Sequence, residues 1–325
     1  FIVEKTVGQM IAERVEPLDD VEARVAALRK LKVMDPACGS GAFLIAAYDC
    51  LEGAYDVILH LLRVQGRLDD ASRIQKHYPD WILADNLFGV DLSKESVEIT
   101  QLALWIRSAR KGTPLSDLSQ NIVCGNSLVA DPSVHERAME WKATFPGVFK
   151  AGGFDCVIGN PPWERLKLQE REFFALSSPK IASAVNAADR RKLIKRVEEE
   201  NPELWTRYHA AKGAAEKTLA HVRGCGQFPF TGRGDVNTYM LFAELSRQVV
   251  APDGLIGLLV PSGIATDDTT KHFFSDLMEK KAISALYDFE NKEGVFADVH
   301  RSFKFSVLLM NGADRQTEAA DFVFF

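Results

Sequence analysis

The sequence of 325 residues has little of what marks membrane, secreted or metal-binding proteins. It contains no stretch near the roughly 18 consecutive apolar residues that cross a bilayer, and its first residues lack the layout of a signal peptide. Its five cysteines are scattered without a CxxC pair, which suits neither a zinc site nor a disulfide framework. These absences predict a soluble protein of a reducing cytoplasm that uses no metal ion.

An excess of positive charge is also missing, because 39 Lys and Arg stand against 45 Asp and Glu, for a net charge of −6. Contact with nucleic acid would therefore require local basic patches. What the sequence does have is 46% hydrophobic residues, enough for a large core. The chain starts without Met and stops at Phe322–Phe325, which resembles the middle of a strand, so we expect a fragment of a longer protein.

Short apolar strands alternate with longer helical stretches, which predicts an α/β fold with a doubly wound, mostly parallel sheet covered by helices on both faces. In the first half, strands are expected at 31–34, 88–90, 121–124 and 154–158, and helices at 42–64 and 93–109. After residue 233, helices are expected at 237–250 and 269–280, and strands at 255–260, 283–289 and 303–310. The last two strands would form an antiparallel hairpin.

Residues 164–233 break this alternation, since they are rich in charge and helix formers and have almost no strand signal. We interpret them as a helical insertion between two halves of the sheet domain, 31–163 and 234–325, which follow an N-terminal helical segment, 1–30. Positive charge gathers in the insertion at Lys180, Arg190, Arg191, Lys192, Lys195 and Arg196. A solvated helix face and a contact with nucleic acid both explain this charge.

A glycine-rich loop, Asp35 to Phe43, lies between the first expected strand and helix. Gly39 and Gly41 let the backbone turn tightly and approach a ligand at the N-terminus of the helix. The loop lacks the third Gly of the dinucleotide fingerprint and the GK[ST] of a phosphate loop, which argues against NAD and ATP. It predicts a nucleotide-type ligand without phosphates, although a purely structural turn explains the same glycines.

Polar residues also follow the next two strands. Asp91 can accept hydrogen bonds from both ribose hydroxyls of a nucleoside. Asn126, in Gly125-Asn126-Ser127, can bond the edge of an adenine ring, while simple turn formation accounts for this tripeptide equally well.

Asn160-Pro161-Pro162-Trp163, after the fourth strand, carries the most specific chemistry. An amino group on an aromatic ring is a poor nucleophile, because its lone pair is delocalised. The Asn160 side-chain oxygen and the Pro161 carbonyl can each accept one amino hydrogen, which localises the lone pair. The prolines stiffen the loop, and Trp163 offers a face for stacking a base. A Pro-rich turn with a buried Trp is the structural alternative.

In this order, the four motifs resemble those of the N6-adenine DNA methyltransferases of bacterial restriction–modification and phage-defence systems, especially type IIG modules. The later segments 234–239, 254–262 and 288–291 also look like that family. The resemblance covers nearly the whole chain. It implies a class I S-adenosylmethionine-dependent methyltransferase fold, S-adenosylmethionine as cofactor, and methyl transfer to N6 of a flipped-out adenine in double-stranded DNA.

The resemblance also assigns roles to residues. The catalytic residues would be Asn160, Pro161, Pro162 and Trp163. The cofactor would be bound by Thr6, Asp35, Ala37, Cys38, Gly39, Gly41, Phe43, Asp91, Leu92, Asn126 and Ser127. Phe296 would stack on the opposite face of the adenine from Trp163, and Arg301 and Lys304 would meet nearby phosphates.

Three residues depart from the family pattern. Trp163 replaces the usual Tyr or Phe, which keeps stacking and alters the pocket size. Asn126 replaces the usual Asp, so we expect weaker cofactor binding without loss of function. Val7 stands where the family usually has Pro.

Two rival interpretations remain open from the sequence. Similar Asn-Pro-Pro-aromatic loops occur in enzymes that methylate glutamine amides in proteins, since an amide nitrogen poses the same chemical problem. A non-catalytic DNA-recognition subunit could also retain the fold. We further expect target recognition to reside outside this chain, and a nuclease or specificity module to be fused to it or supplied by a partner.

Overall fold

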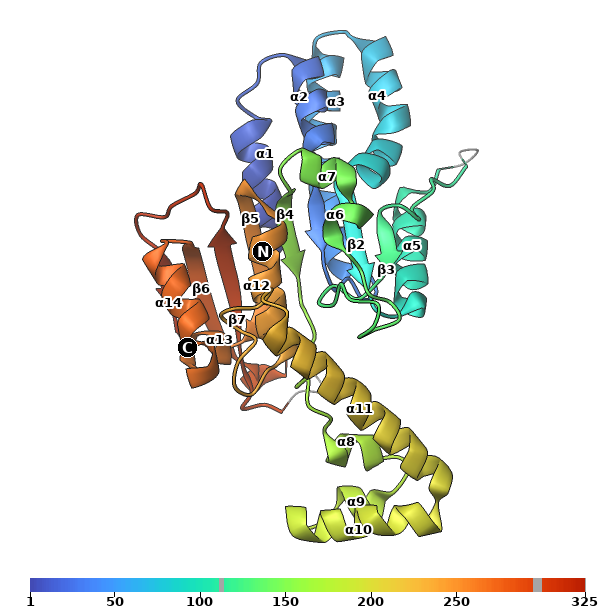
Figure 1. Ribbon diagram of the computed structural model, residues 1–325. Helices are drawn as coiled ribbons and strands as arrows, with labels where there is room; N and C mark the ends of the chain where they lie inside the picture. The colour runs from blue at the N-terminus through green and yellow to red at the C-terminus, as the bar shows by residue number, and fades with distance from the viewer. Residues whose placement is uncertain (111–113, 295–299, 325) are drawn as a thin grey trace.

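The computed structural model of the protein describes residues 1–110, 114–294 and 300–324. The strands in these residues form one eight-stranded sheet in the order β3-β2-β1-β4-β5-β7-β6-β8 (Figure 1). Their bounds are β1 Val33–Asp35, β2 Leu87–Asp91, β3 Ile122–Cys124, β4 Phe154–Gly159, β5 Val250–Pro261, β6 Ile283–Glu290, β7 Lys304–Asn311 and β8 Asp321–Val323.

The first five strands of this order are parallel, and β7 runs antiparallel to both of its neighbours, β5 and β6. The predicted α/β fold, with a mostly parallel sheet and an antiparallel C-terminal part, is therefore confirmed. The expected hairpin of β6 and β7 exists, with Asp288 opposite Ser306. However, β7 enters the sheet between β5 and β6, and β8 adds a parallel edge strand beside β6.

Helices cover both faces of the sheet. Alternate side chains of β4 enter separate cores, because Cys156 and Ile158 point to one face and Val157 to the other. The first core is covered by η1 Glu4–Gly8, α1 Gln9–Arg14, α2 Val21–Lys30, α3 Ala42–Val64, α4 Leu68–Trp81, η2 Ile82–Asn86 and α5 Lys94–Ser108. The second is covered by α6 Trp141–Thr144, α7 Pro146–Lys150, α12 Thr238–Val249, α13 Gly263–Thr266 and α14 Lys271–Glu279. Two short 3-10 turns are η3 Asp268–Thr270 and η4 Asn291–Glu293.

Residues 164–233, which we call the arm, contain α8 Glu170–Phe174, α9 Pro179–Ala182, α10 Ala187–Glu200 and α11 Pro202–Gly224. The arm projects away from the sheet, with α10 at its far end (Figure 1). It has a small core of its own, formed by Phe174, Ile181, Ile194, Val197, Leu204 and Tyr208. At its base the chain pairs with itself, since Leu166 N donates to Val236 O at 3.1 Å.

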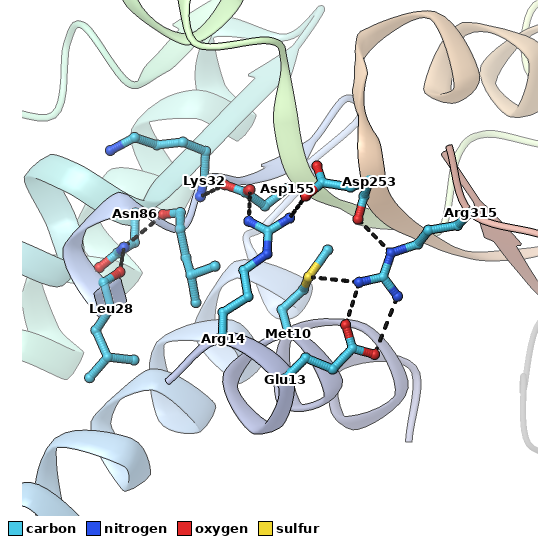
Figure 2. Close-up of polar contacts among 10 residues, drawn as sticks. Met10, Glu13, Arg14, Leu28, Lys32, Asn86, Asp155, Asp253 and Arg315 are labelled. Carbon is cyan, nitrogen blue, oxygen red and sulfur yellow. Dashed lines mark hydrogen bonds and ion pairs between the residues drawn. The ribbon is translucent and has the colours of Figure 1, made fainter. Parts of the chain in front are cut away.

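Ion pairs hold the N-terminal helices against the end of the sheet at which strands β4 and β5 begin (Figure 2). The Arg14 guanidinium binds the carboxylate of Asp155 in β4 and, at 2.7 Å, that of Asp253 in β5. The second Asp155 oxygen accepts a hydrogen bond from Lys32 N at 2.7 Å. Arg315 Nε donates to Asp253 O at 2.5 Å. This network joins segments that are more than two hundred residues apart in the chain.

Within the part of the chain that the structure describes, no helix has both the length and the apolar character needed to cross a membrane. The same residues contain no group of three or more His, Cys, Asp or Glu side chains placed to hold a metal ion.

Candidate active site

The glycine-rich loop is tied to the two βα units beside it. Gly41 caps α3 in a left-handed conformation (φ 84°), and a Cβ there would lie 3.0 Å from Thr100 Cγ2 of α5. Cys38 N donates to Val90 O of β2 at 2.9 Å, and Thr100 Oγ1 donates to Gly39 O at 2.8 Å. A Cβ on Gly39 would meet nothing within 4 Å, so the backbone faces open space at this point. The loop is thus rigid and accessible, as a ligand cradle requires.

Asp91 lies beside this loop at the end of β2. Its Oδ2 accepts a hydrogen bond from Gly39 N at 2.9 Å, and its Oδ1 accepts one from Ser93 N at 2.9 Å. Each carboxylate oxygen keeps a second lone pair for a ligand hydroxyl. The structure therefore brings Asp91 and Gly39 together, and it adds a role that the sequence did not indicate, since the carboxylate also fixes the glycine loop.

Asp35, the last residue of β1, is a buried carboxyl under the same loop. It is 2% exposed, and its Oδ1 accepts a hydrogen bond from Ala37 N at 3.1 Å. Burial raises the pKa of Asp35 to about 7, and the neighbouring Asp91 carboxylate adds to the rise, while the Ala37 hydrogen bond opposes it. A positively charged ligand group close to Asp35 would therefore favour its ionised form.

The tripeptide after β3 is anchored to the glycine-rich loop. Ser127 Oγ donates to Pro36 O at 2.6 Å, and Trp141 Nε1 donates to Ser127 O at 3.0 Å. The Asn126 side-chain oxygen accepts a hydrogen bond from Leu128 N at 3.0 Å, which is a turn-forming contact. The oxygen expected to meet the cofactor adenine therefore already has one backbone partner.

The remaining residues assigned to the cofactor lie at different depths. Thr6 is 1% exposed in η1, and its hydroxyl donates to Ile2 O at 2.9 Å. Its methyl group would be 2.9 Å from a Cβ placed on Gly257 of β5, so it packs against the sheet. Phe43 is half-buried against the first core, and Leu92 is 47% exposed. Burial raises the pKa of the Cys38 thiol, so this residue remains protonated at neutral pH.

The Asn160-to-Trp163 loop leaves β4 next to Asp35. A Cβ on Gly159 would come within 2.7 Å of Asp35 Oδ1, so only glycine allows this approach. Asn160 is exposed, Pro161 is buried and Pro162 is exposed. The sheet therefore places the expected catalytic loop directly beside the expected cofactor loop.

The start of α12 holds the catalytic loop from the other side. Thr238 Oγ1 donates to Pro162 O at 2.5 Å, and Asn237 Nδ2 donates to Trp163 O at 3.2 Å. Asn237 also caps α12 through its side-chain oxygen, which accepts from Tyr239 N at 3.3 Å. The segment 234–239 belongs to the resemblance, but these positioning contacts span more than seventy residues and were not predicted.

Trp163 stacks on Phe303, which precedes β7, with ring centroids 5.7 Å apart and planes inclined by 9°. The two rings line a cleft of about 1190 Å³, whose other walls include Pro261, Ser262 and Lys304. The sequence assigned the second aromatic face to Phe296, which lies outside the described residues. Phe303 was missed, although an aromatic residue between the basic residues Arg301 and Lys304 was an available signal.

Arg301 and Lys304, the residues expected to meet phosphates, are both exposed at the start of β7. Lys304 lines the cleft, and its carbonyl oxygen accepts a hydrogen bond from Ser262 N at 3.3 Å. Beneath them lies a buried polar cluster that the sequence did not reveal. Asp288 Oδ1 accepts hydrogen bonds from Ser306 Oγ at 2.8 Å and from Ser262 Oγ. The cluster links β5, β6 and β7 at the floor of the cleft.

Residues 85–194 match the family model described as the Eco57I restriction-modification methylase. A putative type II restriction enzyme and methyltransferase of Methanocaldococcus jannaschii is 37% identical over 111 residues, which are 31% of this chain and 9% of that protein. A type II restriction enzyme and methyltransferase of Escherichia coli is 23% identical over 89% of this chain and 25% of its own length. The adenine-specific methyltransferase BrxX of Escherichia coli is 28% identical over 28% of this chain and 7% of its own length. The chain thus spans a quarter or less of these relatives.

A solved DrdV–DNA complex has a similar fold, with a TM-score of 0.54 at 14% identity over 100% of this chain and 26% of that one. The open glycine loop, with the Asp35 and Asp91 carboxyl groups beside it, suits a cationic ligand without phosphates. Residues 85–194 are therefore similar to the Eco57I restriction-modification methylases, and the chain as a whole shares the α/β fold of the DrdV protein.

Proposed function

We propose that the protein methylates the exocyclic N6 amino group of an adenine that is flipped out of duplex DNA. The observation that carries this proposal is the position of the Asn160-to-Trp163 loop, which leaves β4 in contact with Asp35 and within a rigid frame. Similarity to an adenine-specific methyltransferase and to a DNA complex of the same fold supports adenine in DNA as the substrate.

The cofactor is expected to lie along the glycine loop, with Asp35, Cys38, Gly39 and Gly41 at its methionine end and Asp91 at its ribose. Asn126 would face its adenine. When bound, it supplies an electrophilic methyl group already activated by the sulfonium. The protein's own task is then alignment of the acceptor nitrogen.

Asn160 and Pro161 act on the acceptor. The side-chain oxygen of Asn160 and the carbonyl oxygen of Pro161 each accept a hydrogen bond from the amino group. These two hydrogen bonds localise the nitrogen lone pair. S-adenosylmethionine, held by the glycine loop and Asp91, would supply the methyl group, and the proton that the amino nitrogen loses would pass to solvent. No strongly basic side chain is needed for this order of events.

Trp163 holds the flipped base by stacking, and Phe303 takes part in its entry. The two parallel rings are at most 5.7 Å apart, whereas a base between them needs about 7 Å, twice the ~3.5 Å contact distance. Phe303 therefore has to move away from Trp163 before a base can stack on that face. Its side chain is 39% exposed, so the ring already borders solvent.

The decisive experiment incubates the full-length protein with labelled S-adenosylmethionine and duplex DNA, then identifies the labelled nucleoside by mass spectrometry. We expect N6-methyladenine, with a roughly 10²–10³-fold lower rate for Asn160→Ala, as for the removal of one transition-state hydrogen-bonding group. Cofactor and DNA binding by the variant should remain at wild-type levels.

Two companion measurements separate the rivals: the same labelling reaction with cell-extract protein added as a competing acceptor, and direct binding of S-adenosylmethionine and of DNA. Label on a protein glutamine instead of DNA would replace the DNA substrate with a protein one, since the loop chemistry suits an amide nitrogen too. DNA binding without S-adenosylmethionine binding would favour a non-catalytic recognition subunit. Equal rates for the wild type and Asn160→Ala would remove the catalytic role of the loop.

A further inference from the structure

The arm and the rest of the protein carry opposite net charges. Residues 164–233 contain 14 Lys or Arg and 9 Asp or Glu, a net charge of +5. The remaining residues contain 25 Lys or Arg and 36 Asp or Glu, a net charge of −11. The acidic balance of the whole chain therefore conceals a basic projection, which is an electrostatic feature suited to a polyanion.

The charge is concentrated on one face of α10. Arg191, Lys192, Lys195 and Arg196 form two pairs at i, i+4 spacing, and all four side chains are exposed. The opposite face of the same helix carries buried Ile194 and Val197. We call these four basic residues the α10 face.

The cations of the α10 face differ in their partners from those of the sheet domain. None of the four takes part in an ion pair with another described residue. In the sheet domain, by contrast, Arg14, Arg107 and Arg315 are all held by carboxylates. The four cations of the α10 face thus lack a direct carboxylate contact among the described residues, although Glu198, Glu199 and Glu200 follow in the last turn of the same helix.

The α10 face rests on a folded support. Besides the small core of the arm, Arg190 Nε donates to Glu170 Oε2 at 2.9 Å, and Tyr208 OH donates to Glu170 Oε1 at 3.0 Å. These contacts join α10, α8 and α11. The four cations are therefore displayed on a packed helix and not on a loose loop.

The arm also starts and ends at the catalytic loop. The chain enters it directly after Trp163 and returns at Thr238, whose hydroxyl binds Pro162 O at 2.5 Å. Helix α11 connects this base to α10, and its 23 residues span roughly 35 Å at 1.5 Å per residue. That length corresponds to about 10 base pairs of duplex at 3.4 Å each.

We propose that the α10 face binds the phosphate backbone of the same duplex whose adenine enters the cleft, at a point about one helical turn from the target base. This proposal rests on the proposed function for its partner. The arm would fix the register of the duplex relative to Trp163 without reading its sequence, because contacts to phosphates position a protein and do not specify bases.

The test replaces Arg191, Lys192, Lys195 and Arg196 together by Gln in the full-length protein, since Gln preserves length and helix propensity. DNA affinity is then measured against salt concentration on a duplex with at least 20 base pairs on each side of the target. We expect the slope of log K against log salt to become shallower by up to about 3.6, roughly 0.9 for each phosphate that the variant no longer neutralises. The matched control changes four exposed cations of the sheet domain to Gln and should leave the slope unchanged: Lys30, Arg63, Lys76 and Lys150.

A second measurement needs no variant. Shortening the DNA flanks of the wild-type complex to fewer than about five base pairs should reduce the slope by the same amount, whereas the arm variant should not respond. Equal slopes for the wild type and the arm variant on long DNA, or no effect of flank length on the wild type, would overturn the proposal.

These readouts are independent of methyl transfer. If the slopes change as expected but no N6-methyladenine forms, the DNA-binding role of the arm stands and the proposed reaction fails. If methylation depends on Asn160 and the slopes do not change, the reaction stands and the role of the arm fails.

Discussion

Asp35 and Asp155 lie on the neighbouring parallel strands β1 and β4, but at opposite ends. Asp35 is the last residue of β1, and Asp155 is near the start of β4. Asp155 receives the Arg14 guanidinium on one oxygen and the Lys32 N–H on the other, at 2.7 Å. Asp35 is more deeply buried, yet it receives the Ala37 N–H at 3.1 Å and faces the carboxylate of Asp91. Two aspartates of the same sheet therefore have opposite electrostatic environments.

The difference separates stability from ligand binding. At the edge where β4 and β5 begin, charges meet their counterions within the protein (Figure 2), which fastens the N-terminal helices. At the carboxyl ends of β1, β2 and β4, acidic and amide groups have no buried cation beside them among the residues that the structure describes. The carboxyl ends of the strands are where α/β folds bind their ligands.

The largest effect is expected from Asp35→Asn, which should change how the free energy of unfolding depends on pH. Because the folded pKa, about 7, lies above the ordinary 3.8, the contribution of Asp35 to the free energy of unfolding should be largest below pH 4 and be lost as pH rises towards 7. The full fall is at most about 4 kcal/mol. Asn cannot ionise, so denaturant titrations across pH 4–8 should show this decline in the wild type and not in the variant. Asp314→Asn, an exposed control, should follow the wild type, and parallel curves for all three proteins would contradict the expectation.

The second largest effect is expected at the other end of the sheet, where β4 and β5 begin. Asp155→Ala leaves the Arg14 guanidinium and the Lys32 N–H without their acceptor, so we expect a loss of about 2–3 kcal/mol in the free energy of unfolding. Asp253→Ala removes a partner of the same arginine, but this carboxylate is 64% exposed and its loss should have a much smaller effect. Methylation rates well below the melting temperature should be unchanged in both variants. A catalytic defect in Asp155→Ala without loss of stability would contradict the assignment of this end of the sheet to stability and of the other end to ligand binding.

The smallest effect is expected from Phe303→Ala. Removing this ring uncovers Trp163, so we expect the base to enter more easily and KM for DNA to fall by the equivalent of about 1–2 kcal/mol, with kcat unchanged. Fluorescence of 2-aminopurine at the target position would report whether base flipping becomes easier or harder. An unchanged KM together with unchanged fluorescence would show that Phe303 has no part in base entry.

Local signals in the sequence were sufficient for much of the fold. The helices expected at 42–64 and 93–109 are confirmed; Gly41 begins the first and Ser93 caps the second, both through contacts within one turn. Helix α4 was missed, since it contains Pro79 near its end, and proline is disfavoured in helix interiors. The place of β7 between β5 and β6 was also missed, because the pattern of a strand does not reveal its partners.

The candidate site was predictable to a similar extent. The order of motifs along a parallel sheet is enough to bring Asp35, Gly39, Asp91 and Gly159 together at one edge. The contacts of Thr238 with Pro162 and of Phe303 with Trp163 join residues 76 and 140 positions apart, and they depend on how the arm and β7 return to the sheet. Such long-range pairs follow from tertiary packing and leave no local pattern.

The position of β7 also has a consequence for synthesis. The ribosome releases β5, then β6, and β7 only afterwards, yet β7 separates the other two in the sheet. The space between β5 and β6 must therefore stay open on the nascent chain until residues 304–311 emerge. Phe303 and Lys304 arrive with this strand, so we expect the wall of the cleft to form only after residues 303–311 have left the ribosome.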